Sequence, residues 1–559
     1  MKKRLTTLGA ALGVSALLLS ACGGSGGNGD GGKEGGGSPV EVSGTKASDT
    51  YEGQEGGEIT FAGCNPQDLL IPGFTQETCG GNVLDSILVG LTEVDPSTGK
   101  PRLANAESIE ANDENTMFTV KLKDWKFDDG SPVTAKSYVD AWNWGANGAN
   151  GAKQQAFFGP GFLDVKGYDK IAESKDKGAT MEGLKVVDDK TFTVETTSAN
   201  SLFETMVVHS TYMPLPEAFF KDHEAYGKKP IGNGPFKLTE YKQEQQIVLE
   251  KNTDYQGEAK AHVDKLTFKM YTEPGAAYAD VVAGNVDYVD AIPPDAVAGN
   301  KWQTDLGEGR WQLGPSTLWN GYSFPQYDEK FKDPKVRQAI SMAIDRQAVT
   351  DAVTNGENTP GTAWSPPGIE PFQDDVCGDK CHVDGEAAKK LLEEGGGFEG
   401  TLTIAFNNDG PGNKEVTEAV CTSINENLGI DCQPQSFPTF AEMLDKIDAK
   451  EMTGMYRSGW QADFPSPLSY LTAYYITDAG SNKSGYSNPE YDKMASEILS
   501  QDEAEQEATF KKMQETLAED MPVTPLWYGT LRLGWSDKVV APQVTWKSTI
   551  DFTTVGLKK

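Results

Sequence analysis

Apolar and polar residues alternate along several short segments of the chain, and this period of two predicts β-strands. The clearest strands are expected at 116–122, 401–406 and 453–458, and another begins at 430–435. Segments with an apolar residue at every third or fourth position lie between them and predict helices. Alternating strands and helices predict an α/β fold.

Two helices carry clear start signals. Thr134 follows a turn and is a suitable N-cap for a helix that reaches Trp142. A second helix is expected over 333–349, because Asp333 can cap it and Pro334 suits its first turn. Its apolar face is formed by Val336, Ala339, Ile340, Ala343 and Ile344.

Residues 401–458 predict a β-α-β unit followed by one more helix and strand. The helix over 415–428 ends at Gly429, and the next helix over 440–449 leads to the strand at 453–458. Ligands of open α/β sheets bind beyond the carboxyl ends of the strands. The end of this last strand is therefore a candidate binding position.

The stretch MYRSGWQADFPSPLSYL, residues 455–471, begins at that position. It holds two opposite charges, Arg457 and Asp463, with the large aromatic Trp460 between them. A surface loop with an incidental ion pair is the simplest interpretation of these residues alone. Their place at a strand end favours a binding site instead.

The N-terminus resembles an export signal. A basic start, Lys2 to Arg4, precedes an apolar stretch from Leu8 to Leu19 that is too short to span a bilayer. The following "LSAC" resembles the lipobox of bacterial lipoproteins, which implies cleavage before Cys22 and a lipid on its sulfur. The alternative is an ordinary signal peptide followed by a chance cysteine.

Residues 22–57 are rich in glycine and polar residues and predict a disordered tether after the signal peptide, 1–21. Such a segment has an average reach of about 30–35 Å. It contains "GGSGG", which formally matches the G-x-S-x-G of serine hydrolases. That motif requires a strand-turn-helix context, which a disordered linker lacks.

Composition limits the function of the remaining body, which is long enough for several domain-sized units. A net charge of −33 argues against nucleic acid and against adsorption to anionic lipid. With 37% hydrophobic residues and 11 tryptophans, the chain can bury a large core.

The 7 cysteines leave an even number once Cys22 is set aside, as expected in an oxidising compartment. Pairing between nearest neighbours predicts disulfides Cys64–Cys79, Cys377–Cys381 and Cys421–Cys432. The segment "CGDKCH" could instead suggest a metal site, but no paired CxxC or HExxH accompanies it, so we expect no metal and no cofactor.

Several segments together resemble the oligopeptide-binding branch of the family 5 extracellular solute-binding proteins, the lipoprotein receptors of ABC importers. The landmarks are, in order, AESIEANDENTMFTVKLKDWKFDDGSPVTAKSYVDAW, PIGNGPFKLTEY, VRQAISMAIDRQAV, YSNPEYDKMASEIL and TPLWYG. Their order and spacing extend from about Ile59 to the C-terminus.

The resemblance implies an α/β, two-lobed, periplasmic-binding-protein-like type II fold around a ligand cleft. It implies three domains: a discontinuous domain I over 58–85, 205–315 and 525–559, domain II over 86–204, and domain III over 316–524. The lobes of such proteins close over the ligand by a hinge.

The resemblance also assigns ligand-binding roles. It implies that Asp463 accepts the ammonium group of a peptide, that Arg457 takes a carboxylate, and that the backbone of Gly459 and Gln461 pairs with the ligand. Candidates for the cleft walls are Trp460, Trp319, Tyr322 and Trp527. Each of these aromatics alone is more often a core residue. Asp140 and Gly529 depart from the family pattern, so ligand length and sequence preference do not carry over.

The expected function is capture of short peptides and their delivery to ABC permease subunits. The protein is expected to be a monomer that is lipid-anchored at the outer face of the cytoplasmic membrane. A nickel chelate, an oligosaccharide or a peptide-like signal remains an alternative ligand. A chelate would more plausibly use histidine, and no histidine lies near residues 455–471 in the sequence. An exported peptidase or glycosidase is the third alternative, and no catalytic residue is assigned.

Overall fold

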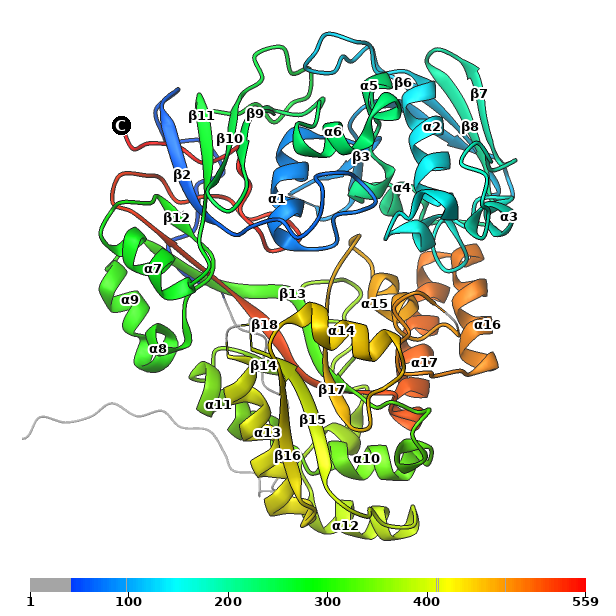
Figure 1. Cartoon of the computed structure of the whole chain (residues 1–559), viewed down its shortest axis with the longest axis vertical. Helices are drawn as coiled ribbons and strands as arrows, with labels where there is room; N and C mark the ends of the chain where they lie inside the picture. Colours follow the sequence, from blue (N-terminus) through cyan, green and yellow to red (C-terminus); the bar gives the residue numbers. More distant parts are fainter. Residues whose placement is uncertain (1–41, 97, 409, 411, 478) are drawn as a thin grey trace, which may run out of the picture. The chain divides into compact units, whose positions relative to one another are not determined.

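A large mixed β-sheet forms the centre of the fold in a computed structural model that describes residues 42–96, 98–408, 410, 412–477 and 479–559 (Figure 1). The central path of this sheet has the order β16-β15-β17-β13-β18-β12-β2-β11-β10-β9. The bounds, in that order, are Cys432–Phe437, Leu402–Asn407, Met455–Gln461, Trp311–Ser323, Val523–Trp535, Tyr288–Val289, Glu58–Gly63, Lys265–Met270, Gln246–Lys251 and Phe236–Lys242. Two short strands join it, β1 (Ser43–Gly44) on β13 and β14 (Thr359–Pro360) on β18.

The predicted β-α-β unit is present, with β15 parallel to both β16 and β17. Successive residues of β15 face opposite sides of the sheet. Ile404 packs in the cluster that contains α13 (Asn413–Leu428), and Ala405 packs with α14 (Phe440–Asp448). Both faces are covered, which explains why β15 is almost entirely buried.

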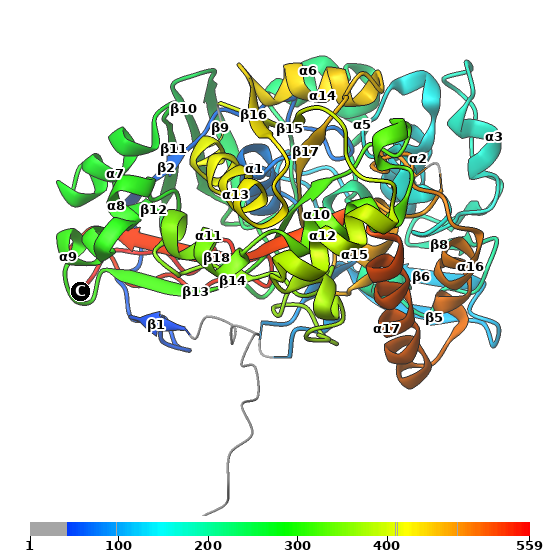
Figure 2. The same ribbon diagram turned by 90° about the horizontal axis from the view of Figure 1, so that it is seen from below.

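Two long antiparallel strands, β13 and β18, run side by side through the sheet (Figure 2). One end of the pair adjoins β12 and the other adjoins β17. Their pairing is interrupted between Pro315 and Trp319. The predicted boundary at 315/316 falls at this irregularity, whereas the one at 524/525 falls near the start of β18. The contacts of residues 36–559 do not divide them further, so the three domains remain a prediction.

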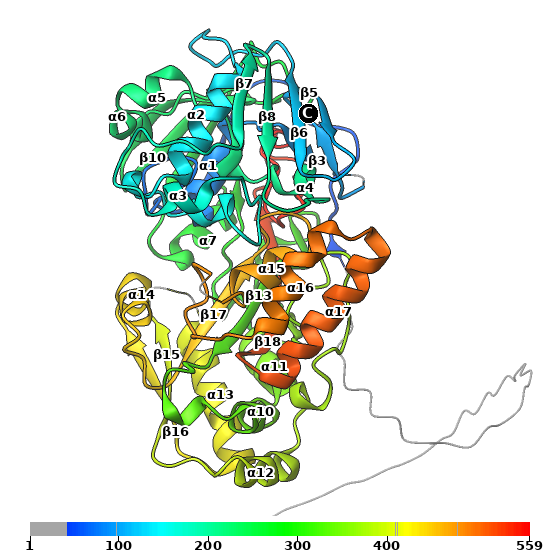
Figure 3. The same cartoon turned by 90° about the vertical axis from the view of Figure 1, so that its right-hand side faces the viewer.

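A separate four-stranded sheet has the order β5-β6-β8-β7 (Figure 3). These strands span Ala106–Ala111, Met117–Leu122, Thr191–Glu195 and Leu184–Asp188, and a two-stranded sheet joins β3 (Thr92–Val94) to β4 (Pro101–Leu103). Helix α2 (Ala135–Ala146) covers the sheet through Tyr138 and Trp142, whose rings pack on Phe192 of β8. Thr134 caps α2 in a capping box, as predicted.

The remaining helices surround these sheets. Those of the first half of the chain are α1 (Thr78–Ile87), α3 (Tyr168–Ala172), α4 (Phe203–Met206), α5 (Glu217–Lys221), α6 (His223–Lys228), α7 (Pro274–Val282), α8 (Pro294–Val297) and α9 (Lys301–Leu306). Those of the second half are α10 (Pro334–Met342), α11 (Arg346–Thr354), α12 (Gly385–Glu394), α15 (Leu468–Ala473), α16 (Pro489–Glu497) and α17 (Glu503–Asp520).

The single helix predicted over 333–349 is wrong, because the chain forms two helices there. Asp333 caps α10 as expected, but α10 ends at Met342. Asp345 accepts a hydrogen bond from the N–H of Ala348 and so begins α11 as a new N-cap. The apolar pattern continues across the break because residues 343 and 344 are buried as well.

The predicted tether boundary at residue 57 also needs correction. Residues 43 and 44 form β1 on β13, and the N–H of Gln54 donates to the carbonyl of Leu557 at 2.7 Å. The ring of Tyr51 stacks on His262 with centroids 3.5 Å apart. One aromatic ring and a series of backbone hydrogen bonds therefore attach this glycine-rich segment to the body. The rest of the tether, the signal peptide and Cys22 lie outside the described residues.

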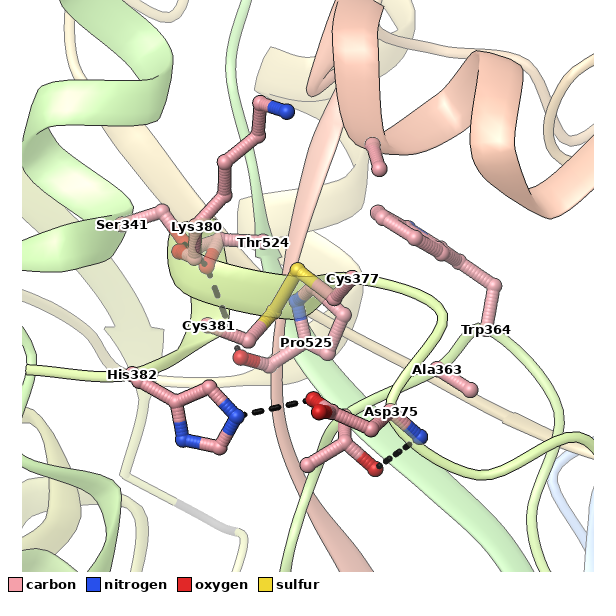
Figure 4. Close-up of a disulfide and its surroundings, with 12 residues drawn as sticks. Ser341, Ala363, Trp364, Asp375, Cys377, Lys380, Cys381, His382, Thr524 and Pro525 are labelled. Atoms are coloured by element: carbon pink, nitrogen blue, oxygen red, sulfur yellow. Dashed lines mark hydrogen bonds and ion pairs between the residues drawn. A yellow bond between two sulfur atoms is a disulfide. The ribbon is translucent and has the colours of Figure 1, made fainter. Parts of the chain in front are cut away.

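The structure pairs six cysteines as nearest neighbours, Cys64–Cys79, Cys377–Cys381 and Cys421–Cys432, which is the pairing that the sequence predicts. Figure 4 shows the second bridge beside Thr524 and Pro525 of β18. The neighbouring His382 contacts Asp375 at 2.8 Å. Within the described residues, no group of three or more His, Cys, Asp or Glu side chains is arranged to hold a metal ion.

Candidate binding site at the end of strand β17

Strand β17 carries half of the predicted ligand-binding residues, and one of its edges is open over more than half of its length. β13 pairs with it from Tyr456 to Gln461. β15 pairs with it only at Met455 and Tyr456. Among the described strands, β17 thus has one partner from residue 457 onward. An extended strand edge of this kind is a template for pairing with another chain.

Asp463 lies two residues beyond β17, and its carboxyl group is held on one oxygen. Oδ2 accepts hydrogen bonds from Trp460 Nε1 at 2.9 Å and from Ser469 Oγ at 3.1 Å. Its backbone N–H donates to Ser469 Oγ at 2.8 Å. Ser469 lies in α15 and therefore fixes the carboxylate relative to both β17 and that helix.

Burial dominates the electrostatics of this carboxyl group. The Asp463 side chain is only 15% exposed. Burial raises the pKa of Asp463 to about 7, against the opposing effect of the Trp460 and Ser469 donors and the positive charge of Lys547. A carboxylate buried in this way is stabilised by any cation that reaches it.

A histidine lies beside this carboxylate, contrary to the impression given by the sequence. His209 Nε2 is 3.6 Å from Asp463 Oδ1, although 254 positions separate the two residues. His209 precedes a short 3-10 turn, Ser210–Tyr212. Among the described residues, no third His, Cys, Asp or Glu side chain joins this pair in a group arranged to hold a metal ion.

Lys547 connects the C-terminal segment to the same region. Its ammonium group contacts Asp85 of α1 at 2.9 Å, and its carbonyl accepts a hydrogen bond from Gln461 Nε2 at 2.5 Å. Its charge acts on the pKa of both Asp463 and His209. The ion pair with Asp85 partly offsets the charge of Lys547, so Lys547 is no full counter-charge for the Asp463 carboxylate.

Arg457 lies within β17 and has different neighbours. Its Nη1 donates to Asn407 Oδ1 at 3.1 Å, and its guanidinium lies 5.9 Å from the ring centre of Phe440. These two contacts of Arg457 are with β15 and α14, whereas Asp463 contacts Trp460 of β17, Ser469 of α15 and His209. The two charges mark different positions along the same strand edge.

The aromatic candidates divide into two groups. Trp460 is half-buried and packs edge-to-face on Tyr474, with ring centroids 5.2 Å apart. Trp319, Tyr322 and Trp527 are buried in the packing around β13 and β18. These three side chains are thus surrounded like core residues, and a role in the cleft walls remains a prediction for them.

Of the two backbone candidates, Gly459 already has a side-chain partner. The hydroxyl of Tyr474 donates to the carbonyl of Gly459 at 2.9 Å. Gln461 contacts the Lys547 carbonyl through its side chain. Sequence reasoning missed His209, Ser469, Tyr474 and Lys547. Only Ser469 falls inside the stretch that the sequence singled out, and the others carry no local signal.

The fold and this carboxyl group together indicate a class of protein. An α/β body with a buried carboxyl group at the end of an open strand edge suits a solute-binding protein of the two-lobed type. Residues 100–482 match the family described as bacterial extracellular solute-binding proteins, family 5 Middle. The chain belongs to this family.

Similar proteins agree with this assignment. The chain is 27% identical over 547 residues to the oligopeptide-binding protein OppA of Bacillus subtilis, covering 95% of each chain. It is similar in structure to Haemophilus influenzae OppA in complex with the peptide RPPGFSPFR, with a TM-score of 0.77, 24% identity and coverage of 91% and 100% of the two chains. The Escherichia coli murein tripeptide binding protein MppA gives a TM-score of 0.78 at 21% identity, with coverage of 92% and 100%. These structures share the two-lobed fold of the family.

Proposed function

We propose that this chain captures short peptides through their free N-terminal ammonium group and delivers them to the permease of an ABC importer. The observation that carries the proposal is the Asp463 carboxyl group at the end of the open edge of β17. Membership of the solute-binding family supports a transport role, and the names of several relatives refer to peptides.

The ligand would use the open edge of β17 as an added strand. Backbone groups between Arg457 and Gln461 would pair with the extended peptide, which gives affinity without reading its sequence. Tyr474 occupies the Gly459 carbonyl, so pairing at that residue replaces one existing hydrogen bond. Arg457 would meet a ligand carboxylate farther along the edge.

The electrostatics favour an ammonium ligand over a neutral one. Ionised Asp463 is costly while it is buried without a full counter-charge, as its raised pKa indicates. An ammonium group in contact with Oδ1 supplies that charge and returns the carboxyl group to its ionised form. A neutral sugar would leave the cost in place.

The cellular setting follows from the family and the N-terminal sequence. Proteins of this family are extracellular by description. We further propose that Cys22 carries the lipid that holds a monomeric receptor at the outer face of the cytoplasmic membrane. In the described part of the chain, no helix has the length and apolar character needed to cross a membrane.

The test is titration calorimetry of residues 42–559 with a mixture of tri- to pentapeptides, followed by mass spectrometry of the retained species. We expect binding of free peptides and recovery of intact peptides after incubation. Binding of oligosaccharides or nickel chelates in place of peptides would contradict the ligand class, and cleaved peptides would contradict a passive receptor.

A further inference from the structure

His209 is a buried histidine whose ring packs against two aromatic side chains. Its ring stacks on Phe157 with centroids 4.5 Å apart and planes 12° apart, and it meets Tyr212 edge-to-face. The residue is 5% exposed. The packing alone would suit a core histidine, so the neighbours of the two ring nitrogens decide what other role the side chain can have.

The hydrogen bond at Nδ1 defines the tautomer of the ring. The N–H of Thr211 donates to His209 Nδ1 at 3.3 Å, so Nδ1 carries a lone pair. In a neutral imidazole the other nitrogen then carries the proton. Nε2–H is therefore a donor, and it is the atom that lies near Asp463 Oδ1.

The ring stays neutral at physiological pH. Burial, helped by the charge of Lys547, lowers the pKa of His209 well below its usual value. Protonation of Nδ1 would also set one N–H against that of Thr211. His209 thus contributes a dipole to the site and no charge that would repel an ammonium group.

The two oxygens of Asp463 have different surroundings. Oδ2 accepts from Trp460 and Ser469, which lie close to Asp463 in the sequence. Oδ1 faces His209 Nε2 at 3.6 Å, which is longer than a hydrogen bond. A carboxylate oxygen can accept more than one hydrogen bond, so Oδ1 has capacity for a ligand while the imidazole limits the space around it.

The other titratable groups around Asp463 do not duplicate this role. Tyr212 and Tyr470 are buried, and Tyr470 donates to the carbonyl of Thr317. Lys547 is paired with Asp85. Among these groups, His209 is the one whose donor is directed at Oδ1.

We propose that His209 is a positioning and specificity-determining residue for the N-terminal ammonium group of the ligand. Its neutral Nε2–H orients Oδ1 and favours the ionised carboxylate without adding positive charge, and its ring closes the space that an N-acyl group would need. The proposal rests on the proposed function, because it concerns the same carboxylate.

The experiment compares His209→Leu, His209→Gln and the control His262→Gln with the wild type. Leucine keeps apolar packing and removes the donor, glutamine keeps an N–H donor, and His262 contacts Glu55 and Tyr51 instead. Titration calorimetry with trialanine and N-acetyl-trialanine is run between pH 5.5 and 8.5, and the melting temperature of each variant is recorded.

We expect His209→Leu to weaken trialanine binding about tenfold or more, because the variant loses the imidazole dipole directed at the charged Oδ1 and leaves the ammonium–carboxylate pair less well positioned. Binding of N-acetyl-trialanine is expected to stay the same or to improve. His209→Gln and His262→Gln should retain trialanine binding within a few fold. Without the donor, the carboxyl pKa rises, so the loss of trialanine affinity on acidification should begin at higher pH in His209→Leu.

Three outcomes separate the possibilities. Equal weakening of both probes in His209→Leu and His209→Gln, with a lower melting temperature and an unchanged pH profile, would show a packing role and overturn the proposal. Unchanged trialanine binding in His209→Leu would also overturn it while leaving the proposed function intact. Failure of the wild type to bind either probe or any peptide mixture would overturn the proposed function itself.

Discussion

At the scale of single residues, the site depends on one carboxyl group in an unusual setting. Asp463 is buried, held by two neighbouring donors and faced by a neutral histidine. Its pKa of about 7 means that ionisation costs free energy in the folded protein until a cation arrives. The raised pKa of Asp463 and the position of Arg457 each lead to a prediction.

The first prediction concerns stability without peptide. Because the pKa of Asp463 is raised on folding, the folded state holds a proton that the unfolded state has lost between about pH 4 and pH 7. The contribution of Asp463 to wild-type stability should therefore decrease as the pH rises through this window. Asp463→Asn lacks the titration, so it should gain relative to wild type as the pH rises, by about 1.4 kcal/mol for each unit of pKa shift.

Chemical denaturation of both proteins at pH 5 and pH 8 measures this difference. Ser466→Ala is a suitable neighbouring control, because Ser466 has no contact with the Asp463 carboxylate among those described. An identical pH dependence for wild type and Asp463→Asn would show that this carboxyl group is not the source of the effect.

The second prediction concerns Arg457. If its guanidinium takes a ligand carboxylate, Arg457→Gln should weaken binding of tri- to pentapeptides with a free C-terminus by about tenfold, the scale of a charged hydrogen bond. Peptides with an amidated C-terminus should bind wild type and variant alike. Calorimetry with matched peptide pairs tests this, and equal losses for both forms would remove the role from Arg457.

At the scale of elements, local sequence patterns were informative because they depend on neighbouring residues. The period of two in 401–406 and the Gly429 stop predicted β15 and α13 closely. The break between α10 and α11 was missed because the apolar pattern continues through it. Asp345 was visible, but an aspartate inside a helical pattern becomes an N-cap only if the backbone turns there.

The open edge of β17 gives a prediction about Tyr474. Its hydroxyl competes with a peptide for the Gly459 carbonyl, so Tyr474→Phe should bind peptides a few fold more tightly, consistent with one neutral hydrogen bond of about 1 kcal/mol. The control is Tyr491→Phe, which removes a hydroxyl from the Leu471 carbonyl away from β17. Weaker binding in Tyr474→Phe would mean that the hydroxyl contacts the ligand itself.

A second prediction at this scale concerns Arg346, which joins three elements. Its guanidinium donates to Pro525 of β18, to Ser341 of α10 and to Cys381 beside the second disulfide. Burial lowers the pKa of Arg346 to about 9. Removing the guanidinium breaks these charge-assisted hydrogen bonds to buried carbonyl groups, each worth about 1.5–3 kcal/mol.

Arg346→Met should therefore reduce the free energy of unfolding by about 3 kcal/mol or more, because it removes several of these hydrogen bonds at once. Lys389→Met, a charge removal on the surface of α12, serves as the control and should change stability by less than about 1 kcal/mol. Guanidinium denaturation measures both variants. Equal stabilities would show that the buried arginine is replaceable.

At the scale of the whole molecule, the sequence predicted the family and one strand edge but only part of the site. Asp463 and Trp460 share a short segment, so their contact was within reach of sequence reasoning. His209, Asp85 and Lys547 reach the same place from distant segments. No periodicity or spacing encodes such long-range proximity, and it becomes visible only when the chain is folded.

The strand connections indicate how ligand binding at the proposed site could affect distant parts of the chain. The long strands β13 and β18 join the sheet region around β12 to the one around β17. The carboxylate lies near β17, whereas His209 and Asp85 belong to segments outside the β15-β17 unit. A ligand that stabilises this cluster would therefore stabilise the arrangement of several distant segments at once.

The most direct test of the account is a two-by-two titration by calorimetry, with wild type and Asp463→Asn against trialanine and N-acetyl-trialanine. We expect acetylation to weaken wild-type binding about tenfold or more and to weaken binding to the variant by a smaller factor, because both changes remove the same ion pair while the His209 ring still restricts the acetyl group in each protein. If acetylation costs the same affinity in both proteins, the ammonium group does not bind at Asp463, and the proposed capture of peptides through this carboxyl group is wrong.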